Sequence, residues 1–278
     1  MKKWRFSVFF TIGLALLFIG SPLLAQNYTV SLKDGAVDWS NGVIEAVGTG
    51  FPIRDPINMA QARAAAKGAA VEAARKNLWD IMLGIRVDSS TLIRDLIARS
   101  EELGKAIHGF WQQANVICVS YRSDGSVEAT VSIKLTASFA DLVLPPSIEA
   151  IHPIKQPGPP SQEKEEAYTG LVLDCRGIKL SPAMALVVLD EDGNEVYGSS
   201  YVSREYATQH GMVGYSKDPT AAQRDGRVGT TPITIKGIRA AGTGLSDVVI
   251  SNADAARIKR AASNLSFLQK SMVMIVLD

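Results

Sequence analysis

Asp190, Asp192 and Asn194 are the residues whose types and spacing come nearest to a metal site. They stand at alternate positions of the segment DEDGNE, as oxygen ligands do at the start of an EF-hand calcium loop. That loop needs glycine at its sixth place and a bidentate Glu at its twelfth. Here glycine is fourth and the twelfth residue is Tyr201. The segment is therefore interpreted as a plain hairpin turn, and no metal site is predicted.

Two glycine-rich segments begin like phosphate-binding loops. GTGFP (48–52) and GTGLS (242–246) both start with G-x-G, but neither completes G-x-G-x-x-G or lies inside a βαβ pattern. The sequence also contains no G-x-x-x-x-G-K-[ST] motif. Both segments are predicted to be flexible connections, and no nucleotide or other cofactor is expected.

Catalytic side chains are few and scattered. The three histidines form no H-E-x-x-H motif, and no G-x-S-x-G nucleophile elbow occurs. Cys118 and Cys175 either pair in an oxidising compartment or remain free, buried thiols, because pairing cannot be deduced from sequence. The sequence therefore predicts a non-enzymatic protein. A hydrolase whose site assembles only in space is kept as an alternative. The histidines are His108, His152 and His210.

A polar segment, residues 198–229, together with the residue just before it carries tyrosines that are suited to contact a partner. Tyrosine buries a large area at low entropic cost and is enriched at interfaces. The same rings could instead cover the edge of a C-terminal core. The candidate partner contacts are Tyr197, Tyr201, Tyr206 and Tyr215, together with the helix residues Arg63 and Arg75.

The first 25 residues have the pattern of a secretory signal peptide. Lys2, Lys3 and Arg5 precede an apolar stretch from Phe6 to Ile19, and Ala25 offers a small residue at the cleavage point. The stretch is shorter than the ~20 residues of a spanning helix, so cleavage is favoured over an uncleaved membrane anchor. The mature chain is expected in the periplasm or in association with the outer membrane.

The charge balance argues against nucleic acid as a partner. The whole chain has a net charge of +1, and the signal peptide carries three positive charges and no acids. Cleavage lowers the number of Lys and Arg residues from 29 to 26, whereas the number of Asp and Glu residues stays at 28. Nucleic-acid binding needs a basic face, and the mature chain has no such excess.

A proline-rich segment divides the mature chain. Six of the 12 prolines fall between Pro145 and Pro160. Proline fixes φ and removes an amide donor, so the segment is predicted to be an extended linker. The expected organisation is a signal peptide (1–25), an N-terminal domain (26–143), a linker (144–167) and a C-terminal domain (168–278).

The N-terminal half predicts a β-α-α-β-β order, with helices on one face of a small antiparallel sheet. A β-prone run (41–52) is stopped by its glycines, and an alanine-rich helix (57–85) follows. Small side chains let a helix lie close to a sheet, so tight docking is expected, with a buried partner for Asn77. The predicted buried face of this helix comprises Ala62, Ala66, Ala69, Ala70, Ala73, Asn77 and Ile81.

The remaining N-terminal elements are a second helix and a hairpin. Caps at residues 88–90 and leucines at helical spacing predict one helix that ends between Gly104 and Gly109. A β-rich run (109–121), a Ser-Asp-Gly turn and a strictly alternating run (127–135) then predict two paired strands.

The C-terminal half predicts a separate α/β domain, so the whole chain is assigned to the α+β class. It should contain about four strands and one clear helix, which starts at Ser251 or Asn252 and ends near Asn264. The predicted strands are residues 170–175, 185–190, 247–251 and 272–277.

Residues 41–135 together resemble a known family. GVIEAVGTGFP, NMAQARAAAKGAAVEAARKNL, GIRVDSST and IHGFWQQANVICVSYRSDGSVEATVSIKL follow one another in this order. The succession resembles a family of small outer-membrane lipoproteins that also includes flagellar proteins, and it is similar to the N-terminal domain of flagellar assembly protein T. The motifs that carry the likeness are Gln61-Ala62-Arg63, Arg75-x-Asn77-Leu78 and Gly109-Phe110.

This resemblance implies a small α/β domain with a structural or assembly role in the outer envelope, in some members around the flagellar basal body, and no catalysis. The lipoprotein members carry a lipidated Cys, and Ala25-Gln26 stand in its place here. We therefore expect an exported, non-enzymatic envelope protein that acts through protein–protein contacts. Envelope proteins, among them basal-body components, are the expected partners. An oligomer and peripheral outer-membrane association are compatible with the sequence.

A second function class is kept beside this one. It is a periplasmic ligand-binding or signalling module, with a pocket between the domains or under residues 198–229.

Overall fold

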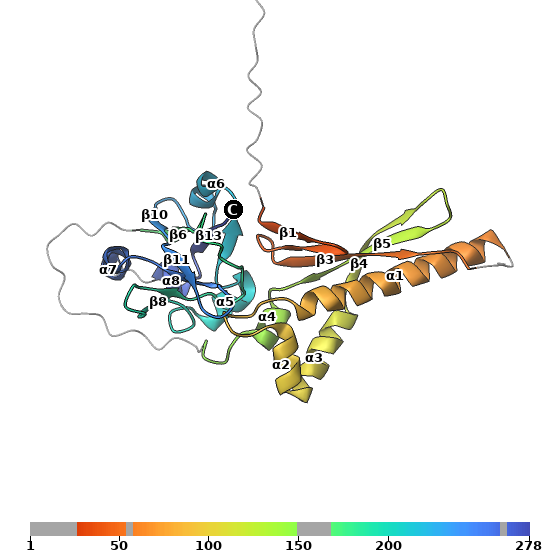
Figure 1. The fold of residues 1–278 in the computed structure, drawn as a ribbon, viewed down its shortest axis with the longest axis horizontal. Helices are drawn as coiled ribbons and strands as arrows, with labels where there is room; N and C mark the ends of the chain where they lie inside the picture. The colour runs from red at the N-terminus through yellow and green to blue at the C-terminus, as the bar shows by residue number, and fades with distance from the viewer. Residues whose placement is uncertain (1–26, 54–57, 149–167, 262–265) are drawn as a thin grey trace, which may run out of the picture.

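Two α+β halves follow one another along the chain, and the predicted fold class is confirmed (Figure 1). The computed structural model describes residues 27–53, 58–148, 168–261 and 266–278. The predicted signal peptide and residues 149–167 of the predicted linker lie outside these residues. Across the described ranges, no helix is long and apolar enough to cross a membrane.

The N-terminal half is built on a five-stranded antiparallel sheet. Its order is β1-β2-β3-β5-β4. β5 alternates between buried and half-exposed residues as predicted, and Gly125 adopts a φ of +84° in the predicted hairpin turn. The strands are β1 Thr29–Leu32, β2 Gly35–Asp38, β3 Val43–Gly50, β4 Asn115–Tyr121 and β5 Val127–Lys134.

Helix α1 (Met59–Leu83) crosses one face of this sheet. Asn58 caps it by accepting the Gln61 N–H at 2.8 Å. Three of the seven residues predicted to be buried are buried alanines, and Ala73, Asn77 and Ile81 are half-buried. The prediction is wrong for Ala69, which is exposed. The buried residues advance four at a time, so the stripe winds around the helix and follows the twist of the sheet. The buried residues of α1 are Ala62, Ala66, Ala70, Ala74, Leu78 and Met82.

Gly48 and Gly50 lie inside β3, directly against α1. A Cβ atom at Gly48 would lie 2.5 Å from the Ala70 carbonyl oxygen, and one at Gly50 would collide with the Ala66 carbonyl oxygen. Only glycine permits this approach. The prediction that these glycines stop the strand and form a flexible connection is therefore wrong. The predicted partner of Asn77 is the Val47 carbonyl oxygen, at 2.7 Å.

The predicted second helix is in fact two helices, α2 (Ile93–Arg99) and α3 (Glu101–Gln112). Ser100 separates them because its backbone is extended, and its side chain caps α3 by accepting the Leu103 N–H at 3.2 Å. Both glycines that were expected to end the helix lie inside α3. A short helix, α4 (Ser138–Val143), follows β5.

The C-terminal half contains eight strands in two sheets within the described residues, more than the four that were predicted. A parallel sheet has the order β10-β6-β13-β9, and a mixed sheet has the order β11-β12-β7-β8. Each predicted run contains a strand. The strands are β6 Gly170–Asp174, β7 Val188–Leu189, β8 Glu195–Tyr197, β9 Gly214–Ser216, β10 Pro232–Lys236, β11 Arg239–Ala241, β12 Asp247–Val249 and β13 Val273–Val276.

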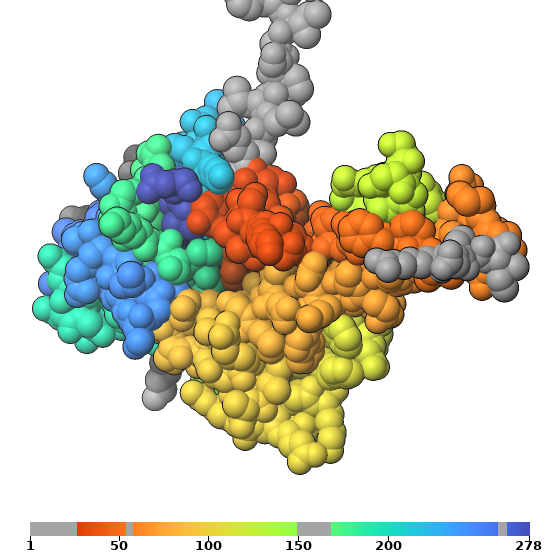
Figure 2. All heavy atoms as spheres, turned by 45° about the vertical axis from the view of Figure 1, so that its right-hand side comes forward, coloured from red at the N-terminus to blue at the C-terminus, as the bar shows by residue number. Residues whose placement is uncertain are grey.

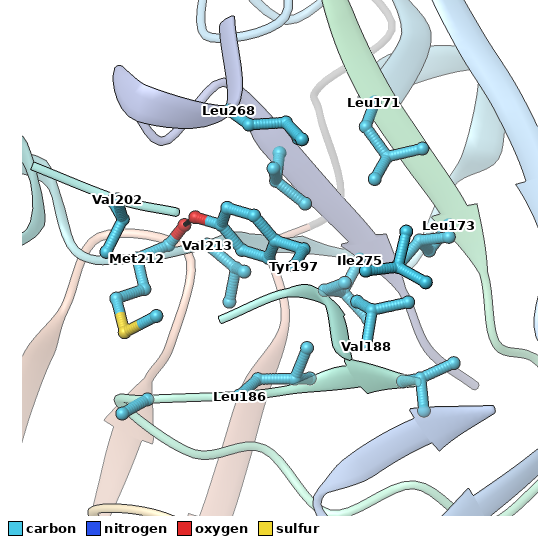
Figure 3. Close-up of a cluster of buried hydrophobic side chains, with 14 of the residues drawn as sticks. Leu171, Leu173, Leu186, Val188, Tyr197, Val202, Met212, Val213, Leu268 and Ile275 are labelled. Atoms are coloured by element: carbon cyan, nitrogen blue, oxygen red, sulfur yellow. Dashed lines mark hydrogen bonds between the residues drawn. The ribbon is translucent and has the colours of Figure 1, made fainter. Parts of the chain in front are cut away.

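The core of this half lies between the two sheets. Figure 3 shows Leu171 and Ile275 from the parallel sheet facing Val188 and Tyr197 from the mixed sheet, all of them buried. The predicted helix is α7 (Asn252–Ala261), and its expected end near Asn264 lies outside the described residues. The other helices are α5 Arg204–His210, α6 Pro219–Arg224 and α8 Ser266–Gln269.

The two halves meet through backbone hydrogen bonds. The Arg86 and Val87 carbonyl oxygens accept the N–H groups of Met184 and Ala185 at 3.0 and 2.7 Å. Beyond them, the Ser89 carbonyl oxygen accepts the Gly244 N–H at 2.6 Å. Leu144 and Ile148, which belong to the predicted linker, are buried in the core of the C-terminal half.

Candidate interaction surface

The calcium-like residues form a turn between β7 and β8, as predicted. The Asp190 carboxylate accepts the N–H groups of Asp192 and Asn194 at 3.1 and 2.8 Å, and Gly193 has a φ of +83°. No group of three metal-binding side chains occurs in the part of the chain that the structure describes. These hydrogen bonds explain the alternating polar residues without a ligand.

The second glycine-rich segment is not a flexible connection. Gly242 adopts a φ of +76°, and a Cβ atom at Gly244 would collide with the Arg86 guanidinium. The segment therefore packs against the loop that follows α1, and its glycines are needed for that close approach. The prediction of flexibility is wrong here for the same reason as in β3.

Both cysteines are free, so the disulfide alternative does not hold in this structure. Cys175 is buried, and desolvation, with a smaller effect of Asp174, raises the pKa of its thiol to about 12. Cys118 is exposed on β4, which corrects the expectation of two buried thiols. His108 lies against Trp79 and Trp111.

Two of the four predicted tyrosine contacts are core residues. Tyr197 is 0% exposed and donates a hydrogen bond to the Met212 carbonyl oxygen at 2.5 Å (Figure 3). Tyr215 is 3% exposed. Rings this deeply buried have no surface to offer a partner, so the prediction is wrong for these two. Tyr201 and Tyr206 are half-buried.

The two predicted arginines lie on α1, in the other half of the molecule. Arg63 is exposed and Arg75 is half-buried. The structure therefore does not bring the six predicted contact residues together in one surface.

A cavity of about 280 Å³ lies where the halves meet. Arg227 lines it, and its guanidinium donates to the Ser271 carbonyl oxygen at 2.9 Å, to that of Gly211 at 3.3 Å and to that of His210. Burial lowers the pKa of Arg227. Residues of the 198–229 segment line one side of the cavity. Its lining includes Trp39, Gly42 and Leu135 from one half and Gln209, His210 and Arg227 from the other.

Asp247 is the most buried acid of the junction, at 8% exposure. Its carboxylate accepts the Val187 N–H at 3.3 Å and a hydrogen bond from the Ser89 side chain. Desolvation raises the pKa of Asp247, and the negative charge of Asp88 adds to this rise. A raised pKa in the folded state means that the contribution of the group to stability is complete below the unfolded-state pKa and is lost as the pH rises.

Asp247→Asn should therefore make the protein more stable than the wild type at pH 7, because the buried charge is removed while one acceptor oxygen remains. The advantage should shrink as the pH falls toward 3, where the wild-type carboxyl group is protonated. Urea unfolding of both proteins between pH 3 and 7 measures the difference. A difference that stays constant with pH would show that the carboxyl group is not strained by burial.

Large apolar side chains are exposed on the N-terminal half, on the β4 strand and around the connection from β3 to α1. Of the nine such residues in the described ranges, six lie on β4 or between the end of β3 and the start of α1. In Figure 2 the β4–β5 hairpin and the start of α1 lie at the end of the molecule away from the C-terminal half. The six residues are Phe51, Ile53, Met59, Val116, Ile117 and Tyr121, with exposures between 43% and 69%.

Sheet width explains the exposure of Val116 and Tyr121 on β4. Five strands about 4.8 Å apart span roughly 20 Å, whereas one helix is about 10–12 Å wide. α1 packs chiefly on β3 and β5, so the outer strands extend beyond it on both sides. Beside β1 and β2 a cleft of about 470 Å³ remains, lined in part by Val30, Val37 and Ile81. Beside β4 the apolar residues are open to solvent.

β4 is also an edge strand, so the backbone groups on its outer side have no partner strand. Its sequence, NVICVSY, contains no charge and no proline. Soluble proteins usually protect such edges with charges, prolines or bulges. β4 has one of these devices, a bulge between Val116 and Cys118. The residue pattern predicts a β-rich run here, but its place at the sheet edge depends on the strand order.

Comparison with known proteins places the C-terminal half only. Residues 170–278 match the family model of the second domain of Treponema pallidum Tp0624. No curated protein matches the chain. The match covers less than half of the chain, so the C-terminal half is similar to the second domain of Tp0624.

Proposed function

We propose that this protein is an exported envelope protein that acts by binding other proteins rather than by catalysis. The observation that carries the proposal is the open β4 edge with its exposed apolar side chains. An uncharged edge strand offers unpaired backbone groups to a partner strand, and its apolar side chains supply area to bury. The signal-peptide pattern of residues 1–25 supports the export part of the proposal.

A role in outer-membrane or flagellar basal-body assembly is the finer form of this proposal. It is supported by the resemblance of residues 41–135 to small outer-membrane lipoproteins and flagellar assembly protein T. Fractionation of cells that carry a tagged copy tests it. We expect recovery with the outer membrane and basal bodies, and the basal-body fraction should disappear in a non-flagellated strain. Recovery as a free periplasmic protein would leave only the likeness of fold.

Contact through β4 is tested by placing a photo-cross-linking amino acid at position 117 or 121 in cells. Both side chains are more than half exposed, at 52% and 58%. We expect a discrete cross-linked band from these positions. Leu245, which is 47% exposed in the C-terminal half, is the matched control and should give none. A chain that forms no adduct at either β4 position would contradict the proposal.

A ligand-binding module is the second candidate, and the cavity between the halves favours it. Its volume of about 280 Å³ is close to the lower limit of typical ligand pockets. Any ligand that binds the folded state raises the melting temperature by mass action. A thermal-shift screen with small metabolites and cell-wall fragments is the test. Its control is Gln209→Trp, which places a bulky side chain at the cavity from a helical position on α5. The absence of any shift would count against this function.

A further inference from the structure

We infer that the partner of the β4 edge is a second copy of this chain, joined by antiparallel pairing of the two β4 strands. This inference rests on the proposed function and names its partner. The pairing would join two five-stranded sheets into one continuous antiparallel sheet around a two-fold axis. Three features of β4 point to a second copy: its free backbone, its uncovered apolar side chains and its lack of charge.

The unpaired outer backbone of β4 determines where a second strand would bind. β4 has seven residues, against four in β1, the other edge strand of the sheet. Seven residues span about 23 Å. The bulge between Val116 and Cys118 disturbs one position and leaves Cys118–Tyr121 in regular pairing with β5. The outer side of this regular stretch is available for a new ladder of hydrogen bonds.

The apolar side chains favour a copy over a single added strand. Val116, Val119 and Tyr121 stand opposite Val131, Ala129 and Val127 of β5. Those three β5 residues are buried, on the face that α1 covers. Directly opposite residues point to the same face, so this apolar strip of β4 lies beside α1. A second copy would bring an identical strip and a second α1 to the same face. Both strips would then be buried between the two helices.

The absence of charge on β4 removes a usual obstacle to self-association. A two-fold axis places like residues near each other, so a charged edge would repel its copy. Asn115–Tyr121 carries no charge. The next residue, Arg122, is already paired with Glu128 of the same hairpin. The strand can therefore meet itself without opposing like charges.

The test uses the mature chain in sedimentation velocity over a range of concentrations. We expect a reversible dimer. Ile117 lies at the bulge, directly before the regular stretch. Ile117→Lys places one positive charge from each copy at the proposed interface and should weaken dimerisation at least about tenfold. The matched control is Leu32→Lys on the opposite edge strand. Leu32 is 45% exposed and Ile117 is 52% exposed, and the control should leave the dimer intact. Circular dichroism melts verify that both variants remain folded.

Cys118 provides an independent probe of the interface. It is exposed on β4, whereas Cys175 is buried. A short bismaleimide should link two chains through Cys118 in the dimer, and Cys118→Ser should abolish the link. A monomer at all concentrations would overturn the inference, and so would a dimer that is insensitive to Ile117→Lys and is not linked through Cys118. If such a chain still gave an adduct with another protein from position 117, the proposed function would stand and only this partner would be wrong.

Discussion

Gly48→Ala should lower the free energy of unfolding by about 3 kcal/mol, the upper end of the usual cost of overpacking a core. The added methyl group would lie 2.5 Å from the Ala70 carbonyl oxygen and 2.7 Å from the Ala73 carbonyl carbon. Both are backbone atoms of α1, so no side-chain rotation can relieve the collision. The helix would have to move away from β3, and its alanines are too small to fill the gap that follows.

Gly68→Ala is the matched control, since Gly68 lies in the same helix on its exposed side. Nothing lies within 4 Å of a Cβ atom added there. The substitution should stabilise the protein by about 0.5–1 kcal/mol, because alanine favours the helix over glycine. Urea unfolding followed by circular dichroism measures both variants. Equal effects of the two substitutions would contradict the close approach of α1 and β3.

The contact between α1 and β3 shows which features local sequence patterns can predict and which they cannot. α1 was predicted within two residues of its ends, because its alanines are a local signal. β5 was predicted from its alternation. Gly48 and Gly50 were misjudged because glycine is a poor strand residue in isolation. Their position in β3 follows from the alanines of α1, which makes it a long-range effect.

The C-terminal half was harder to predict for a related reason. All eight of its described strands have two to five residues, too few to show a period. β6 pairs in parallel with β10 and β13, which lie far along the chain. The spacing of the leucines predicts one helix, but Ser100 ends α2 inside this run. Its extended backbone changes the chain direction there, and residue spacing does not predict that change.

The candidate surfaces depend on burial and strand order. Tyrosine composition alone does not separate Tyr215, in the core, from Tyr206, which is half-buried. The uncharged run of β4 was visible in the sequence. Its importance comes from the order β1-β2-β3-β5-β4, which leaves it at an edge. That order depends on the pairing of β3 with β5, and α1, α2 and α3 separate these two strands in the sequence.

Tyr215→Ala should lower the free energy of unfolding by about 3–5 kcal/mol, as for other buried aromatic residues. The reason is that Tyr215 contacts both halves of the protein. Its hydroxyl donates to the Ala183 carbonyl oxygen at 2.7 Å and accepts the Ala183 N–H at 2.9 Å. Its ring contacts Trp39 edge-on, at 5.7 Å between centroids. Its carbonyl oxygen accepts the Ser40 hydroxyl at 2.5 Å. One residue therefore links the parallel sheet to both sides of the junction.

Tyr215→Phe separates the ring from the hydroxyl. It keeps the packing but leaves the buried Ala183 amide and carbonyl groups unsatisfied, so a loss of about 1–3 kcal/mol is expected. Urea unfolding followed by circular dichroism measures the loss of stability. Tyr206→Ala, at a half-buried position, should cost less than about 1 kcal/mol. If Tyr215→Ala instead left stability unchanged and abolished partner recovery, the ring would be a contact residue after all. The core assignment of the tyrosine would then be wrong.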